Sequence, residues 1–161
     1  MGEQAFYIAI LSSAVIAGTP ILYAALGELV TERAGVTNLG VEGMMLIGAV
    51  SGFMAAIVTG NSWIGFAAAM MAGGLMGLIH AVLTVSLRAN QVVSGLALTL
   101  FGTGLSGYLG KGYIGIPVAE PFRGVSLPLL GDLPLLGPIL FRHDVLIYLS
   151  WLVVLALWFF L

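Results

Sequence analysis

The chain has 161 residues, of which 60% are hydrophobic and 7% charged, and its formal net charge is −2. A soluble domain carries about 25% charged residues, so this composition excludes a water-soluble globular protein, and the small charge does not indicate a nucleic-acid partner. Cysteine is absent, which excludes disulfides and thiolate metal sites.

The apolar stretches predict an all-α integral membrane protein, a polytopic helical bundle in the lipid bilayer. A helix needs about 20 apolar residues to cross a hydrocarbon core of about 30 Å. A barrel strand would be shorter and would alternate apolar with polar residues. We expect about five transmembrane helices, with Gly60, Asn61 and Ser62 as the turn between the second and third; the predicted ranges are 5–27, 43–59, 63–87, 91–110 and 145–161.

The last predicted helix ends the chain on apolar residues, Trp158 to Leu161, without a polar flank. We interpret this as the N-terminal part of a longer protein, truncated at its C-terminus. Residues 1–161 would then form a single transmembrane domain.

Charged and amide side chains gather first in residues 27–45, between two apolar stretches. Ionisable groups are costly in a bilayer and usually serve a pathway, a pair or a partner. We interpret Glu28, Glu32 and Arg33 as structural or interface residues near a helix end. Glycines surround Asn38 and Glu42 and permit irregular backbone, which survives at membrane depth only inside protein or along a wet cavity. These two residues therefore either line a solute pathway or brace its wall.

A second polar group follows the third predicted helix, at residues 88–91. Asn90 is a candidate helix cap, and Arg88 a candidate interface anchor. An alternative, functional interpretation makes Gln91, Ser94 and Thr99 hydrogen-bond partners for a polar solute inside the bundle. Earlier in the chain, His80 falls within a predicted helix, where we expect a packed, hydrogen-bonded histidine rather than a proton relay.

Residues 111–143 form the one long loop and hold five of the six prolines. Frequent proline prevents a regular helix, so we expect a kinked apolar segment at the membrane surface, on the extracytoplasmic side. The sequence Leu-Pro-Leu-Leu-Gly occurs twice in it, at residues 127–131 and 133–137. His143, at its end, would belong to a solvated helix start.

Arg33 and Arg88 fall in short polar segments on the same side of a five-helix arrangement. Positive residues in short loops favour the cytoplasm, so we expect the N-terminus outside and both polar segments inside. Small residues recur four positions apart at Gly48 and Gly52, and also at Gly73 and Gly77 and at Gly102 and Ser106. This spacing favours close helix packing.

Enzyme signatures are missing from the sequence. It has no His-Glu-x-x-His motif, no Gly-x-Ser-x-Gly elbow and no P-loop. We therefore expect a transport subunit that is not itself an enzyme and binds no cofactor. If transport uses ATP, another chain must hydrolyse it.

Two segments resemble a known family. Residues 27–45 read GELVTERAGVTNLGVEGMM and residues 87–98 read LRANQVVSGLAL. Both resemble the signatures of ABC importer permease subunits of the nucleoside and simple-sugar group, within the class that includes branched-chain amino acid and ribose permeases. Residues 133–144 provide a third, looser match.

The resemblance implies a multi-pass protein of the bacterial inner (cytoplasmic) membrane that works by alternating access. It implies three partners: a second permease subunit, cytoplasmic ATP-binding subunits that bind the ATP, and an extracytoplasmic solute-binding protein. It favours nucleosides, purine first, or simple sugars as the solute. The alternatives are an ion-coupled secondary transporter or channel using Glu42 or His80, and a membrane enzyme using Glu28 and Glu32.

Overall fold

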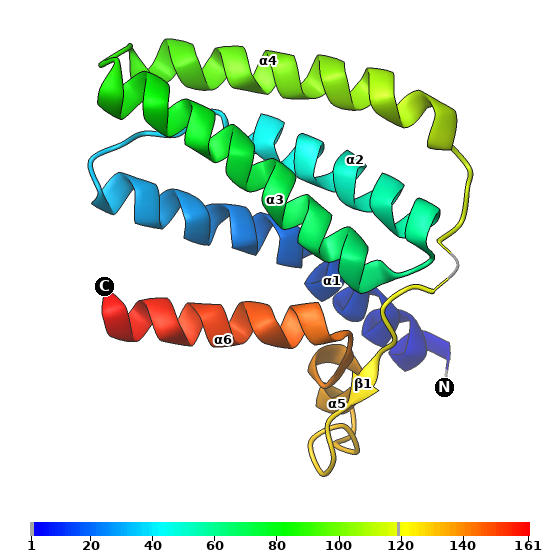
Figure 1. Ribbon diagram of the computed structural model, residues 1–161. Helices are drawn as coiled ribbons and strands as arrows, with labels where there is room; N and C mark the ends of the chain where they lie inside the picture. Colours follow the sequence, from blue (N-terminus) through cyan, green and yellow to red (C-terminus); the bar gives the residue numbers. More distant parts are fainter. Residues whose placement is uncertain (1, 119) are drawn as a thin grey trace. The chain divides into compact units, whose positions relative to one another are not determined.

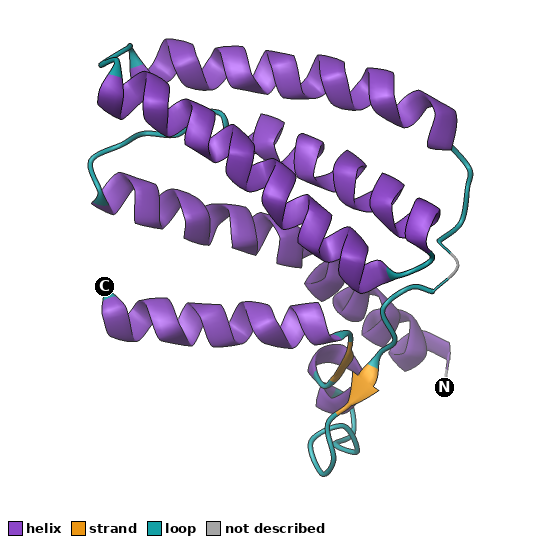
Figure 2. Ribbon diagram, in the orientation of Figure 1, coloured by secondary structure: helices purple, strands orange, loops and turns teal. Residues whose placement is uncertain are grey.

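The computed structural model describes residues 2–118 and 120–161, and it is dominated by helices (Figures 1 and 2). Its elements, in chain order, are α1 (Gly2–Arg33), α2 (Val41–Thr59), α3 (Ser62–Ala81), the π-helical turn η1 (Val82–Ser86), α4 (Gln91–Gly110), the 3-10 turn η2 (Lys111–Tyr113), β1 (Val125–Ser126), α5 (Leu136–Leu140), β2 (Arg142–His143) and α6 (Val145–Phe160).

All five predicted helices form. Four helical stretches among the described residues are long and apolar enough to cross a membrane: Gly2–Arg33, Val41–Thr59, Ser62–Ser86 and Gln91–Tyr113. The fifth, α6, is apolar but has 16 residues, and so spans about 24 Å at 1.5 Å per residue. The first helix extends to Arg33, beyond the predicted end at residue 27.

Helix boundaries follow local capping chemistry. The predicted turn after α2 is confirmed: Gly60 adopts a left-handed conformation (φ 67°), and the Asn61 side chain accepts from the backbone N–H groups of Trp63 and Ile64. Asn90 caps α4 as predicted, with its Oδ1 3.1 Å from the Val93 nitrogen. Asp144 caps α6 in the same way. A side-chain acceptor at this position satisfies N–H groups that have no partner inside the helix.

The end of α1 is a Schellman motif. Gly35 has a φ of 82°, its N–H bonds the Glu32 carbonyl, and the Val36 N–H bonds the Thr31 carbonyl, both at 2.9 Å. Glycine is the residue best suited to this left-handed position because it has no Cβ. The motif therefore ends α1 sharply and sends the chain into a non-helical connection, residues 34–40.

The chain divides into two compact units, and Gly27–Pro121 is one of them. Within it, α2 packs against both α3 and α4 (Figure 1). A Cβ on Gly102 of α4 would lie 2.5 Å from the Gly43 Cα of α2, and one on Gly65 of α3 would lie 2.7 Å from the Gly52 carbonyl oxygen. These backbones approach as closely as small residues permit. Ile47, Met76 and Leu98 form the buried apolar cluster.

The predicted small-residue contacts are only partly confirmed. Gly48 and Gly52 do face α3, because a Cβ on either would lie within 3.2 Å of Gly65 or Ala69. Gly77 does not serve as a packing contact, because a Cβ there would meet nothing within 4 Å. The four-residue spacing identifies a face of small residues but not whether a neighbouring helix covers it.

The second unit combines the chain up to Leu26 with Phe122–Leu161. The repeated sequence in its loop is also a repeated structure: Gly131 and Gly137 each donate to the carbonyl four residues earlier, at 2.8 and 2.9 Å. The third residue of each copy, Leu129 or Leu135, has a positive φ of about 70°. Proline at the second position of each copy interrupts any longer helix, so the loop folds as two successive tight turns.

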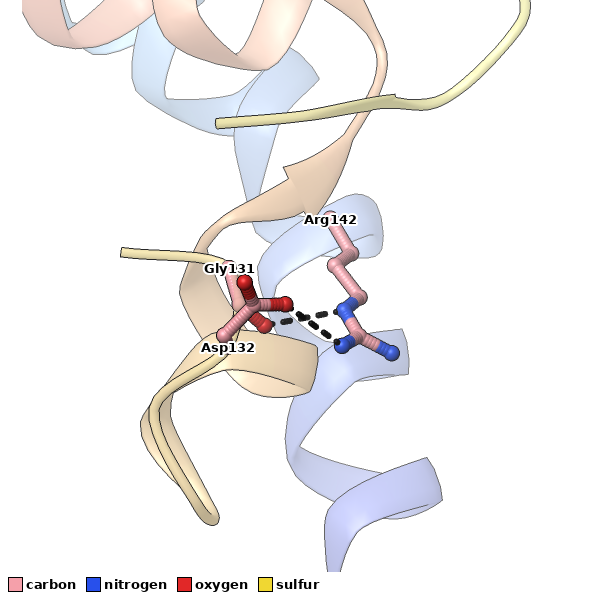
Figure 3. Close-up of polar contacts among 3 residues, drawn as sticks. All are labelled: Gly131, Asp132 and Arg142. Atoms are coloured by element: carbon pink, nitrogen blue, oxygen red, sulfur yellow. Dashed lines mark hydrogen bonds and ion pairs between the residues drawn. The ribbon is translucent and has the colours of Figure 1, made fainter. Parts of the chain in front are cut away.

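Arg142 fastens these turns to the short β1–β2 ladder. Its Nε donates to the Gly131 carbonyl at 3.0 Å, and its guanidinium lies 3.7 Å from the Asp132 carboxylate (Figure 3). Residues 125–143 of the long loop therefore have a defined internal hydrogen-bond pattern.

His143 corrects one prediction. It was expected at a solvated helix start, but it is 3% exposed, and its Nε2 lies 2.7 Å from the Ile139 carbonyl oxygen. Its backbone N–H donates to the Tyr148 hydroxyl, which donates to the Val125 carbonyl. The prediction was wrong because α5 packs against β2 and its Ile139 carbonyl meets the His143 ring, which charge and position in the sequence do not indicate.

The close approach of α2 and α4 makes Gly102 a sensitive position. We expect Gly102→Ala to lower the melting temperature of the detergent-solubilised protein, because the added methyl would overlap the Gly43 backbone and overpacking costs about 1–3 kcal/mol. Gly104→Ala is the matched control on the same helix, since a Cβ there meets nothing within 4 Å. Equal melting temperatures for the two variants would contradict this packing.

Candidate functional site

The candidate site is the connection between α1 and α2, residues 34–40, together with the helices around it. It lies entirely within the unit Gly27–Pro121. It contacts His80 and Thr99. His80 lies about 9 Å along the helix before the end of η1, and Thr99 lies about 12 Å along α4 from its first residue. The connection therefore penetrates between the helices rather than passing over their ends.

Side chains supply the hydrogen bonds to the backbone of residues 37–40. The Thr37 N–H donates to Gln91 Oε1 at 2.8 Å, and the Thr37 carbonyl lies 3.3 Å from His80 Nε2. The Leu39 carbonyl accepts from Thr99 Oγ1 at 2.9 Å. An unpaired backbone group away from water costs about as much as a lost hydrogen bond, so these side chains replace the helical bonds that this stretch lacks.

Glu28 and Asn38 form the inner part of this arrangement. The half-buried Glu28 carboxylate accepts from the Asn38 backbone N–H at 2.9 Å and from Thr31 Oγ1 at 3.3 Å. Asn38 is 8% exposed, and its Oδ1 accepts from the Gly40 N–H at 3.0 Å. Glu28 therefore ties the last turns of α1 to the connection, and Asn38 shapes the turn that leads into α2.

His80 bridges the connection to α4. Because the Thr37 carbonyl can only accept, the Nε2 of His80 donates to it at 3.3 Å, and Nδ1 lies 3.2 Å from Ser94 Oγ, from which it accepts in the neutral ring. His80 is 3% exposed and Ser94 is 7% exposed. The prediction of a packed, hydrogen-bonded histidine is confirmed, and both ring nitrogens are engaged in this state.

The two polar segments of the sequence meet here. Gln91 binds the connection twice, through the Thr37 N–H and, at 3.4 Å, through the Gly35 carbonyl. Gly95 allows the approach, since a Cβ on it would lie 2.9 Å from the backbone nitrogens of Leu39 and Gly40. The structure thus brings together five of the sequence candidates: Glu28, Asn38, Gln91, Ser94 and Thr99.

The remaining candidates lie outside this cluster. Glu42 is exposed in the first turn of α2 and makes no hydrogen bond or ion pair with the described residues. Its negative charge is favourable at this helix N-terminus. Glu32, Arg33 and Arg88 are exposed as well, and Arg88 has a left-handed φ of 54° in the turn before α4.

Sequence reasoning missed the pairing of His80 with Ser94. A signal was present: the two residues are equidistant from Leu87 in the turn between α3 and α4. In a helical hairpin, such residues lie at similar depth. In residues 2–118 and 120–161, no three His, Asp or Glu side chains come together as a metal site would require.

These helices and the side-chain-bonded connection define the class: a multi-pass helical membrane protein. Residues 10–161 match the family described as branched-chain amino acid transport system / permease component. The chain belongs to this family. No solved structure matches the chain.

Three curated relatives are similar to it. A putative glucose ABC transporter permease of Haloferax volcanii is 45% identical over 98% of this chain and 49% of its own length. A guanosine ABC transporter permease of Bacillus subtilis is 37% identical over 82% of the chain and 44% of its own length. A nucleoside ABC transporter permease of Lactococcus lactis is 32% identical over 83% of the chain and 45% of its own length. The chain spans about half the length of these relatives.

Glu28 provides a direct test of how the connection is held. We expect Glu28→Leu to speed hydrogen exchange at the Asn38 amide by roughly tenfold, because a buried donor without a partner costs about 1–3 kcal/mol. Glu28→Gln keeps an acceptor oxygen and should exchange nearly as slowly as the wild type. Hydrogen-exchange mass spectrometry of the peptide covering residues 34–40 measures this.

Glu32→Leu is the matched control, because Glu32 lies one turn away and is exposed. If the two leucine variants exchanged equally fast, the Glu28 carboxylate would not be what protects the connection.

Proposed function

We propose that this chain acts as a membrane-spanning permease subunit of an ATP-binding cassette importer. The observation that supports this most is the family match over residues 10–161, joined by relatives that are named as ABC transporter permeases. In this proposal, the chain moves a small polar solute across the membrane by alternating access and does not itself hydrolyse ATP.

We propose that the connection between α1 and α2 forms part of the solute pathway. It brings hydrogen-bonding side chains of α1, α3 and α4 together among long helices of apolar composition. Because Asn38, Gln91, Ser94 and Thr99 are engaged with backbone and with His80, we assign them to the wall of the pathway. We assign the exposed Glu42 to solute binding. Its carboxylate would accept hydrogen bonds from hydroxyl groups of the solute.

The partners follow from this assignment. They are a second permease subunit, cytoplasmic ATP-binding subunits and an extracytoplasmic solute-binding protein, in the cytoplasmic membrane of the cell. We place the N-terminus and the 111–143 loop outside and both polar segments at the cytoplasmic face, by the distribution of arginine in short loops.

We propose a solute that contains a sugar ring, either a nucleoside or a simple sugar. The relatives are named for glucose, guanosine and nucleosides, and these solutes share a polyhydroxylated ring. Guanosine and glucose are therefore the two solutes to test first, each as a competitor of the other.

The energy source separates this proposal from ion-coupled transport. We expect uptake of labelled guanosine or glucose by cells carrying the complete transporter to require a functional ATPase subunit. Inactivating the P-loop lysine of that subunit should abolish uptake, while a protonophore at constant ATP should leave it nearly unchanged. Uptake that survives loss of the ATPase but stops with the protonophore would instead establish a secondary transporter.

Glu42 tests the pathway. We expect Glu42→Ala to reduce uptake at least roughly tenfold, because a solute hydroxyl hydrogen-bonded to a charged group contributes about 1.5–3 kcal/mol. Insertion and subunit assembly should be normal, as measured by co-purification. Glu32→Ala, also an exposed carboxylate at a helix terminus, is the control and should transport normally. Wild-type uptake by Glu42→Ala would remove this residue from the pathway.

A further inference from the structure

Within the Gly27–Pro121 unit, the pathway proposal gives no role to the buried titratable side chain of His80. His80 is 3% exposed on α3, and neither the apolar packing of α2 and α3 nor the proposed solute contact uses its imidazole. Its ring nitrogens instead reach two different elements, the α1–α2 connection and α4.

Thr37 is held from two helices at once. Its N–H bonds Gln91 on α4 and its carbonyl bonds His80 on α3. Neither bond is a backbone–backbone bond, so the position of this residue depends on the two side chains. Of these two side chains, His80 is buried and Gln91 is half-buried.

His80 also lies at the start of an irregular part of α3. Its own carbonyl accepts from Thr84 Oγ1 at 2.8 Å, and Thr84 belongs to the π-helical turn η1. Turns of this kind are rare and frequently occur at functional sites. His80 therefore contacts three features: its carbonyl bonds the π-helical turn, and its imidazole bonds the non-helical connection and the start of α4.

The buried side-chain atoms of this cluster are all hydrogen-bonded. Among the described residues, no buried side-chain nitrogen or oxygen lacks a hydrogen-bond partner. Such a network rigidifies its surroundings when it is intact, and losing one member leaves the others unpaired at a low local dielectric. The Thr37 carbonyl and the Ser94 hydroxyl would both lose their partner if the imidazole were removed.

We propose that His80 is a positioning residue for transport: by joining the Thr37 carbonyl to Ser94 it holds the α1–α2 connection at a fixed depth against α4. Its effect on transport rests on the proposed function, whereas its effect on the connection does not. His80 touches no solute in this proposal; it acts through residues 37–40.

The first measurement is independent of transport. Residues 1–161 contain no cysteine, so Leu39→Cys introduces one spin-label site among them, on the connection and at a side chain that is 44% exposed; any cysteine elsewhere in the transporter is first replaced. In the purified transporter, His80→Leu should make this label more mobile by electron paramagnetic resonance. His80→Gln, whose amide can still donate to the Thr37 carbonyl, should restore most of the wild-type spectrum.

Ser94→Ala removes only the second bond and serves if His80→Leu fails to fold. We expect intermediate label mobility from it. Ser106→Ala is the matched control on α4, because that hydroxyl bonds the Thr103 carbonyl of its own helix. Wild-type label mobility in Ser94→Ala, and also in His80→Leu if that variant folds, would overturn the proposal.

The second measurement is uptake by the same variants in the complete transporter. A positioning role predicts that His80→Leu lowers the maximal rate by roughly tenfold with the KM for solute nearly unchanged, and that His80→Gln recovers the rate. A large rise in KM, or a wild-type rate in His80→Leu, would overturn it. If the wild-type transporter shows no ATP-dependent uptake, the proposed function fails, and the spin-label result still decides the role of His80 in holding the connection.

Discussion

The structure of the Gly27–Pro121 unit depends on satisfying non-helical backbone inside a bundle of apolar helices. A helix satisfies its own N–H and C=O groups, but residues 37–40 are not helical and contact residues well inside α3 and α4. The Gly40 carbonyl accepts from the Met44 N–H of α2, and the other hydrogen bonds described for residues 37–40 come from side chains, because an apolar surrounding supplies no partners. This requirement explains why side chains from three different helices, among them Glu28, His80 and Gln91, converge on one short connection.

The glycines of α2 and α4 are also needed to satisfy this non-helical backbone, because they set the distance between the helices. A side chain as short as that of Thr99 reaches the Leu39 carbonyl of the connection only if the helices approach closely. Gly43, Gly95 and Gly102 permit this approach, since a Cβ on any of them would overlap neighbouring backbone. The side-chain bonds to residues 37–40 and the small-residue packing are therefore coupled. A change that separates α2 from α4 also weakens those bonds.

A connection held by side chains differs in kind from one held by a backbone ladder. Each of these side chains can adopt other rotamers. Rearrangement of Glu28, His80, Gln91 or Thr99 would therefore let the connection change position while the helices stay intact. In the proposed transport by alternating access, such a rearrangement would give the connection a second position. Glu42, immediately after it, would move with it.

Much of this protein was determined by the sequence alone. Apolar length gave the five helices, and Asn90 and the Gly60–Asn61 turn gave boundaries, because spanning and capping are local. The family signatures at residues 27–45 and 87–98 were likewise legible. Only the tertiary structure decided that five polar residues meet around one connection: Glu28, Asn38, Gln91, Ser94 and Thr99. It alone also decided that His80 joins Thr37 to Ser94 and that His143 is buried. Hydrogen bonds between residues more than fifty positions apart depend on which helix faces approach each other, and uniformly apolar helices carry little periodic signal to specify those faces.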